Sequence, residues 1–263
     1  MTTLKMTSPF NAPVYHEKTV SSTMDVSRRF ALSGEVHGTV FVADFQEKGR
    51  GRIRDRIWEM EESMGLSFTI LLRYPRVEDI PAALTLRTGL AVSLAIEDFT
   101  PSLKGSVLIK WPNDIIIGCK KAAGILCEAD GGNLHLGIGI NMAQKEFPAH
   151  LCERAASIAL ATGRDITHDE RFALLQLILT QLYDELESSA NIESWKSRLE
   201  QRLYKNGEQV VFIKGAADSG KTVKGRLAGI GEGGELLIVP DGETEVFSFI
   251  TGELIFNTQK NNY

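Results

Sequence analysis

Apolar residues recur at helical spacing in several stretches of the chain, and each of these stretches predicts a helix. Residues 21–32, SSTMDVSRRFAL, place Ser or Thr caps ahead of a pattern in which Val26 and Phe30 share one face. Thr167 and Glu170 form a capping box at the start of another such stretch. The pattern as a whole predicts helices over residues 21–32, 81–99, 167–187 and 191–203.

Short apolar runs bounded by turn-forming residues predict strands between these helices. Asp130-Gly131-Gly132 is a strong hairpin signal between the last two runs. Residues 133–140 are expected to form an edge strand, which would allow a homodimer to pair across a two-fold axis. Residues 1–18 are expected to be an irregular leader. The predicted strands cover residues 39–43, 66–72, 106–110, 115–117, 123–129 and 133–140.

The composition changes after Lys205. Residues 208–256 contain many glycines and five short β-rich runs separated by tight turns, which predict a small barrel. The predicted fold class is therefore α+β over residues 1–204, followed by a compact β-domain over residues 205–263.

The charge and the cysteine content of the chain disfavour some classes of function. The 263 residues include 29 basic and 34 acidic side chains, so the net charge is -5 and a general polyanion binder is disfavoured. The 3 cysteines show no metal-binding spacing, which favours reduced thiols. We find neither a signal peptide nor an apolar run of about 18 residues. These features predict a cytoplasmic protein that does not enter a membrane.

One loop nevertheless concentrates positive charge. Residues 46–58 read QEKGRGRIRDRIW, and their basic residues are Lys48, Arg50, Arg52, Arg54 and Arg56. Glycines let a backbone approach an anion, and guanidinium groups match carboxylate and phosphate oxygens. Because the arginines repel one another, we expect the loop to be mobile until an anion neutralises it. A solvated flexible loop and a nucleic-acid patch are the alternatives.

Two further stretches place polar groups at strand ends. In KWPNDIIIGCKKAAGILCE, residues 110–128, the Trp-Pro-Asn-Asp bend puts Lys110, Asn113 and Asp114 at one end of a sheet. Lys121 returns on the next strand, and GIGIN ends a later strand with Asn141. Each of these features also has a structural interpretation, either as a surface ion pair or as a turn-closing amide.

Taken together, the three stretches resemble the motifs of the biotin–protein ligase family. The family pattern combines an STN-like element, Gln-x-x-Gly-Arg-Gly-Arg with a nearby Trp, Lys-Trp-Pro-Asn-Asp, a Lys before Gly-Ile-Leu, and Gly-x-Gly-Ile-Asn. The matching residues here are Ser22, Thr23, Gln46, Gly49 to Arg52, Trp58, Lys110 to Asp114, Lys121, Gly124 to Leu126 and Gly137 to Asn141. The resemblance implies a mixed-sheet catalytic domain of the biotin/lipoate ligase type packed with helices, and a small SH3-like β-barrel.

The same resemblance implies a two-step reaction. Biotin and ATP first give biotinyl-5′-adenylate and pyrophosphate, and a lysine of an acceptor protein then takes the biotin and releases AMP. Biotin and ATP are the implied substrates, and Mg²⁺ accompanies the triphosphate without any metal ligands being indicated. The implied acceptor is a biotin carboxyl carrier domain of acetyl-CoA carboxylase or of another biotin-dependent carboxylase.

Residue roles follow from the resemblance. The implied catalytic residues are Lys121, Arg50, Arg52, Asp114 and Lys110. The implied biotin-binding residues are Ser22, Thr23, Gln46, Gly49, Arg50, Gly51, Arg52, Lys121 and Gly124. The implied nucleotide-binding residues are Arg50, Arg52, Trp58, Asn113, Lys121 and Asn141.

The sequence also departs from the family pattern. Met24 stands where the family usually has Asn, close to the expected biotin site. The stretch Ile53-Arg54-Asp55-Arg56 is one residue longer than usual and lacks a glycine. Because the STN-like element lies near residue 1, we expect no DNA-binding helix-turn-helix, and hence a ligase that does not bind DNA. The competing interpretations are a lipoate–protein ligase, a nucleic-acid-binding protein and a non-catalytic biotin sensor.

Overall fold

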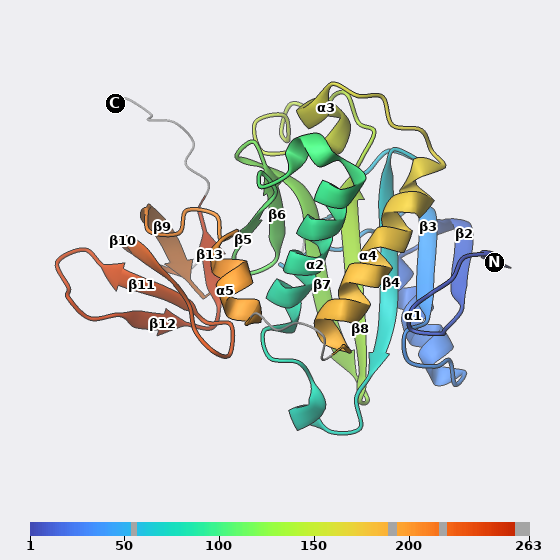
Figure 1. Ribbon diagram of the computed structural model, residues 1–263, viewed down its shortest axis with the longest axis horizontal. Coiled ribbons are helices and arrows are strands. Elements are labelled where there is room, and N and C mark those ends of the chain that lie inside the picture. The colour runs from blue at the N-terminus through green and yellow to red at the C-terminus, as the bar shows by residue number, and fades with distance from the viewer. Residues whose placement is uncertain (54–56, 189–193, 216–219, 256–263) are drawn as a thin grey trace.

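The computed structural model describes residues 1–53, 57–188, 194–215 and 220–255. Within them, a large mixed sheet carries helices on both faces, and a smaller antiparallel sheet lies beside it (Figure 1). In spatial order the large sheet contains β1 (Thr2–Thr3), β2 (Val14–Val20), β3 (Val40–Gln46), β4 (Gly65–Arg73), β8 (Asn133–Asn141), β7 (Lys120–Asp130), β6 (Asp114–Ile117) and β5 (Leu108–Lys110). The small sheet contains β12 (Phe247–Phe249), β11 (Leu236–Pro240), β10 (Lys221–Ile230), β9 (Gln209–Lys214) and β13 (Gly252–Leu254).

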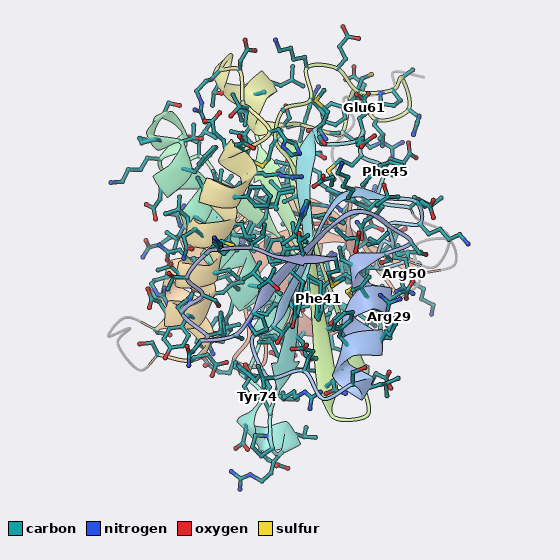
Figure 2. The ribbon with its side chains drawn as sticks, turned by 90° about the vertical axis from the view of Figure 1, so that its right-hand side faces the viewer. Arg29, Phe41, Phe45, Arg50, Glu61 and Tyr74 are labelled. Atoms are coloured by element: carbon teal, nitrogen blue, oxygen red, sulfur yellow. The ribbon has the colours of Figure 1, made fainter. Side chains whose placement is uncertain are left out.

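The helices form a layer on each side of the large sheet. One face packs against α1, with Val26, Phe41 and Leu71 in a small buried cluster. The other face packs against α2 and α4, and the larger apolar cluster of the protein includes residues of both helices and of the strands beneath them (Figures 1 and 2). The helices are α1 (Thr23–Leu32), α2 (Leu84–Phe99), α3 (Ile158–Thr162), α4 (Glu170–Leu186) and α5 (Trp195–Glu200), and short 3-10 turns span Val77–Asp79 and Pro101–Leu103.

The predicted fold class is confirmed. Strands β2 and β3 are parallel, whereas the other paired neighbours in the large sheet are antiparallel, so the sheet is mixed. Five antiparallel strands follow in the small C-terminal domain, in keeping with an SH3-like module. The domain boundary at residue 204 stays a prediction, and it falls in the connection between Glu200, the end of α5, and Gln209, the start of β9.

Two expectations about strands are wrong. Residues 1–18 are not an irregular leader, because β2 runs beside β3 and Val14 is fully buried. Its residues are mostly half-exposed, so no alternating apolar pattern marked the strand. Residues 133–140 are not an edge strand, because β8 pairs with β4 on one side and β7 on the other. A homodimer therefore cannot form by strand addition there.

The helix predicted from Pro81 begins later than expected. Ala83 has a left-handed backbone with φ of 53°, and α2 starts at Leu84. The segment Val77–Phe99 is long and apolar enough to cross a membrane by composition, but 56% of its most apolar window is buried inside the protein. Because α2 packs on α4 and the sheet, we interpret it as a core helix.

Two predictions from short sequence signals, a hairpin turn and a helix start, are confirmed. Gly131 and Gly132, with φ of 55° and 87°, turn the chain between β7 and β8 as the hairpin signal predicted. The Glu170 carboxylate accepts hydrogen bonds from the Thr167 backbone N–H at 2.8 Å and from its hydroxyl at 2.9 Å. These bonds lower the pKa of Glu170, as expected for the acidic partner of a capping box.

Polar contacts hold the small domain, and the segment that leads into it, against the rest of the large domain. Trp111 donates its indole N–H to the Gly234 carbonyl at 3.0 Å. Arg202, on the segment that leads into β9, donates to both carboxylate oxygens of Glu97 at 2.6 and 2.9 Å. Glu97 is only 6% exposed, so this bidentate pair lies in the protein interior.

Replacing Arg202 with alanine is expected to lower the free energy of unfolding by about 3 kcal/mol, because Glu97 keeps its charge in a buried position without its main partner. Chemical denaturation in urea measures this change. The matched control is Arg76→Ala, which removes an exposed arginine paired with Asp79 and should have a much smaller effect. Equal denaturation midpoints for the two variants would show that the Glu97–Arg202 pair does not stabilise the fold.

Candidate active site

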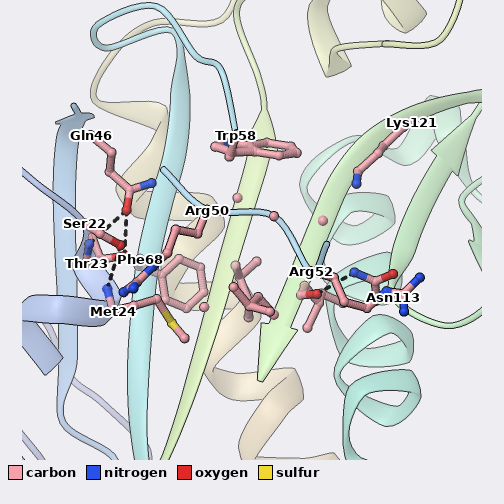
Figure 3. A pocket seen from close by; sticks show the side chains of 17 residues that line it. Ser22, Thr23, Met24, Gln46, Arg50, Arg52, Trp58, Phe68, Asn113 and Lys121 are labelled. Atoms are coloured by element: carbon pink, nitrogen blue, oxygen red, sulfur yellow. Dashed lines mark hydrogen bonds between the residues drawn. The ribbon is translucent and has the colours of Figure 1, made fainter. Parts of the chain in front are cut away.

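A narrow cavity opens on the α1 side of the large sheet, where β3 leads into the basic loop (Figure 3). It encloses about 60 Å³. Glycines of β7 and β8 form part of its floor, and the basic loop with Trp58 covers it. The predicted site residues that line it are Ser22, Thr23, Gln46, Arg50, Gly51, Arg52, Trp58, Asn113, Lys121 and Gly124.

One end of the cavity is built from hydroxyl and amide groups. The Gln46 side-chain oxygen accepts from the Thr23 backbone N–H at 2.9 Å and from its hydroxyl at 3.1 Å. Thr69 on β4 donates its hydroxyl to Thr23 at 2.8 Å, and Ser22 caps α1 by accepting from the Met24 N–H. This network fixes a cluster of polar groups suited to a planar amide or urea.

The opposite end is cationic. Lys121 forms an ion pair with Asp114, with Nζ and Oδ1 2.6 Å apart. The ammonium also lies over the Trp58 ring, 5.6 Å from its centroid. Strand pairing brings the two residues together, because β6 and β7 are antiparallel neighbours and Lys121 lies opposite Ile116, two residues along β6 from Asp114. Lys121 therefore pairs with the aspartate that the sequence left as a possible partner for Lys110.

The loop arginines have partners within the protein. Arg50 reaches α1, where its Nη2 lies 2.5 Å from the Asp25 carboxylate (Figure 2). Arg52 donates to the Gly252 carbonyl of the small domain at 3.0 Å. The expectation that the loop is mobile until an anion neutralises it stays a prediction, and an anion would have to compete with these two bonds. Arg54, Asp55 and Arg56 lie outside the described residues.

Trp58 rests on a platform of two glycines. Gly124 and Gly139 are opposite each other in the β7–β8 pairing. A Cβ at Gly139 would lie 2.6 Å from the indole Cε2, and one at Gly124 would lie 3.3 Å from its Cζ3. Gly49 also approaches closely, since its Cβ would lie 2.6 Å from the Trp58 carbonyl oxygen. Side chains at these positions would lift the indole off the sheet.

Gly139→Ala is expected to weaken binding in the cavity about tenfold or more, because the added methyl overlaps the indole and overpacking typically costs 1–3 kcal/mol. Isothermal titration with biotin measures the change. In a Trp58→Ala background the same substitution should have little further effect, because the clashing ring is gone. Additive losses in the double variant would contradict this contact.

A second cavity adjoins the first. It encloses about 270 Å³ and shares Trp58 and Lys121 with the narrow cavity. Asp114, Asn141 and Arg154 also line it. A third space, of about 110 Å³, has Lys110, Arg52 and Lys121 in its walls, and Lys110 is only 1% exposed. Lys121 therefore stands where all three spaces meet.

The two predicted asparagines make structural contacts. The side-chain amide of Asn113 donates to the Ile125 carbonyl at 2.8 Å, and the backbone carbonyl of Asn113 accepts from the Ile125 N–H. Asn141 is 4% exposed and donates to the Ala156 carbonyl at 3.0 Å. Both still line a cavity, so each amide is held in place beside it.

Several lining residues were not among the named site predictions, although Met24 and the apolar residues of the 123–140 hairpin were expected close to the biotin site. Met24, Leu126 and Gly137 line the narrow cavity, and Arg154 and Glu253 line the second. Gly137 and Gly139 belong to the GIGIN stretch, whose alternating glycines could have indicated a close approach on one sheet face. The Asp25–Arg50 pair had no signal of its own, because the two residues are 25 positions apart.

Comparisons with known proteins agree with the resemblance seen in the sequence motifs. The model of the biotin/lipoate A/B protein ligase family matches residues 17–144. The biotin protein ligase of Aquifex aeolicus, solved in complex with biotin and ATP, is 30% identical and superposes with a TM-score of 0.76 over 92% of this chain and 97% of its own. The chain belongs to the biotin protein ligase family.

Other relatives within the biotin protein ligase family match part of their length. The bifunctional ligase/repressor BirA of Bacillus subtilis is 35% identical over 174 residues, which are 63% of this chain and 51% of that protein. The biotin–[acetyl-CoA-carboxylase] ligase of Mycobacterium tuberculosis is 31% identical over 131 residues, 48% of each chain. This chain thus spans about half the length of these two relatives.

Proposed function

We propose that this protein is a biotin–protein ligase that activates biotin with ATP and transfers it to a lysine of a biotin carboxyl carrier domain. The observation that carries the proposal is one cavity with two chemically different ends. Thr23 and Gln46 supply donors and acceptors at one end, and Lys121 supplies a cation at the other. Biotin has the matching groups, a cyclic urea and a carboxylate, at opposite ends of one molecule.

In the first step, the biotin carboxylate attacks the α-phosphate of ATP, the bond to pyrophosphate breaks, and biotinyl-5′-adenylate forms. The nucleotide would occupy the second cavity, on the other side of Trp58. Lys121 lines both cavities, so its ammonium can offset the repulsion between carboxylate and phosphate and the charge that develops at phosphorus. Arg52 and Lys110 add positive charge to the space beside it.

Mg²⁺ belongs to this step as part of the substrate, bound to the triphosphate. Among the residues that the structure describes, no group of three or more His, Cys, Asp or Glu could hold a metal ion. Phosphate oxygens and water are the usual ligands of nucleotide-bound Mg²⁺. We therefore assign no metal ligands to the protein.

In the second step, the amine of the acceptor lysine attacks the acyl carbon and AMP leaves. The amine must first lose a proton, and Asp114 is the carboxylate nearest to Lys121, at 2.6 Å. We assign it to orient the incoming ammonium and to accept that proton. The acceptor would be a carrier domain of acetyl-CoA carboxylase or of another biotin-dependent carboxylase, as in the relatives named for that substrate.

The experiment is incubation with ATP, Mg²⁺ and labelled biotin, with and without a purified carrier domain. Label on the carrier lysine supports the proposal, and its absence under conditions where biotin-dependent pyrophosphate release occurs would overturn the transfer step. Competition by lipoate tests the lipoate–protein ligase alternative. Single-turnover formation of adenylate tests the sensor alternative, which predicts binding without AMP or pyrophosphate release.

The remaining predictions concern the cellular location and the oligomeric state of the protein. We propose a cytoplasmic location, because Cys119, Cys127 and Cys152 are all free thiols, which suits a reducing compartment. Burial raises the pKa of Cys127 to about 11, so this thiol stays protonated at neutral pH. A homodimer stays a prediction, and it would require a surface other than β8.

A further inference from the structure

We infer that Met24 is the residue that sets the cavity's specificity for the ring of its substrate, by favouring a ring that carries an unoxidised sulfur. This inference rests on the proposed function, since it assigns biotin to the cavity. It concerns the one cavity position at which the chain replaces the polar residue usual in the family by a thioether.

Met24 is held at the polar end of the cavity. It is the second residue of α1 and only 3% exposed, and its backbone N–H is bonded to Ser22. Figure 3 shows it beside Thr23 and Ser22, at the opposite end of the cavity from Lys121. A ligand whose carboxylate lies at Lys121 and whose urea lies at Thr23 would therefore bring its bicyclic ring against Met24.

Gly137 makes room for the thioether. A Cβ at Gly137 would lie 2.7 Å from the Met24 sulfur, so the side chain occupies space that any larger residue would fill. Gly137 pairs with Leu126 across β7 and β8, and Leu126 lines the same cavity. On the side that faces Gly137 and Leu126, the wall of this end is thus sulfur and hydrocarbon.

The Met24 side chain must also move to admit the ring of the ligand. The cavity encloses about 60 Å³, whereas an engineered cavity that binds a single benzene ring encloses about 150 Å³. The floor strands β7 and β8 are paired on both sides and cannot widen easily. Met24 has three rotatable side-chain bonds and a polarizable sulfur, so it can yield to the ring at little cost.

The chemistry of the wall predicts discrimination. A sulfoxide oxygen on the ring needs a hydrogen-bond donor, and burying it without one is costly. Met24 and Leu126 offer none, and the Thr23 hydroxyl already donates to Gln46. The indole N–H of Trp58 is a donor of the cavity without a partner among the described residues, but it lies over Gly139 and not at Gly137, where the Met24 sulfur lies. The cavity should therefore bind biotin and reject its S-oxide, and an asparagine at position 24 should remove the discrimination.

The test is isothermal titration of the whole protein with biotin and with biotin sulfoxide. Wild type should bind biotin at least about tenfold more tightly than the sulfoxide, the scale of one unsatisfied buried acceptor. Met24→Leu should keep that ratio, because leucine also lacks a donor. Met24→Asn should reduce the ratio about tenfold, because its amide can donate to the sulfoxide oxygen.

An unchanged ratio in Met24→Asn, or an equal loss in Met24→Leu, would overturn the inference while leaving the proposed function intact. Failure of wild type to bind either compound would instead overturn the proposed function. If Met24→Asn does not fold, Gly137→Ala supplies the test. Its methyl should push the sulfur into the cavity and weaken biotin binding about tenfold, an effect that should largely vanish in a Met24→Ala background, and equal losses in both backgrounds would overturn the inference.

Discussion

Lys121→Ala is expected to lower biotin-dependent exchange of pyrophosphate into ATP by roughly a thousandfold, the scale seen when one charge-stabilising donor is removed from a transition state. The physical reason is that Lys121 lies between the two cavities proposed for biotin and the nucleotide. Lys121 lines both the narrow cavity and the second one, and its ammonium lies 5.6 Å from the centroid of the Trp58 ring, which the two cavities share. Alanine leaves the carboxylate and the α-phosphate to approach each other without that charge.

The neighbouring lysine provides a matched control. Lys120 carries the same charge one residue earlier, but it donates to the Cys152 carbonyl at 2.7 Å and lines a separate groove. Lys120→Ala should change the exchange rate by no more than about threefold, as expected for a surface substitution. Intact exchange in Lys121→Ala, or an equal loss in Lys120→Ala, would show that the lysine at 121 has no special role in adenylate formation.

Arg52→Ala is expected to release biotinyl-5′-adenylate about 10 to 100 times faster than wild type, because a closed loop keeps a reactive intermediate from water and from solution. Arg52 fastens the loop to the small domain through the Gly252 carbonyl, and its side chain also lines the narrow cavity. Stopped-flow dilution of preformed adenylate measures the release rate, and label on non-acceptor proteins gives a second readout.

Two further variants serve as comparisons for the release rate of Arg52→Ala. Arg52→Lys keeps the charge but loses the planar fork of donors, so it should give an intermediate release rate. Arg76→Ala removes a distant exposed arginine and should release adenylate at the wild-type rate. If Arg52→Ala retains the intermediate as long as wild type does, the loop does not gate release.

Sequence motifs predicted much of the site because they sit at strand ends. Lys110 closes β5 and Asp114 opens β6, so the short-range turn signal between them already grouped the two residues at one sheet end. The strand signal likewise placed Gln46 where β3 ends and the basic loop begins. The hairpin at Gly131 and the capping box at Glu170 were equally local. Such features depend on a few adjacent residues, and tertiary packing did not override them.

Long-range pairing could not be predicted in the same way. β2 carries little apolar periodicity, and it is a strand because β3 supplies partners for its backbone. β8 was expected at an edge, but β4 pairs along its whole length although the two are far apart in the chain. Which strands become neighbours depends on the packing of the whole sheet, which no single segment encodes.

The sequence alone determined which chemical groups this protein brings to its site: a glycine-bearing arginine loop, a lysine at 121, and hydroxyl and amide groups near residues 22–46. Only the tertiary structure decided how they are used. It bonded Arg50 to α1 and Arg52 to the small domain, placed Trp58 on Gly124 and Gly139, and set Met24 against Gly137. Such contacts join segments through space, so which partner each group meets follows from the packed fold and not from local pattern or spacing.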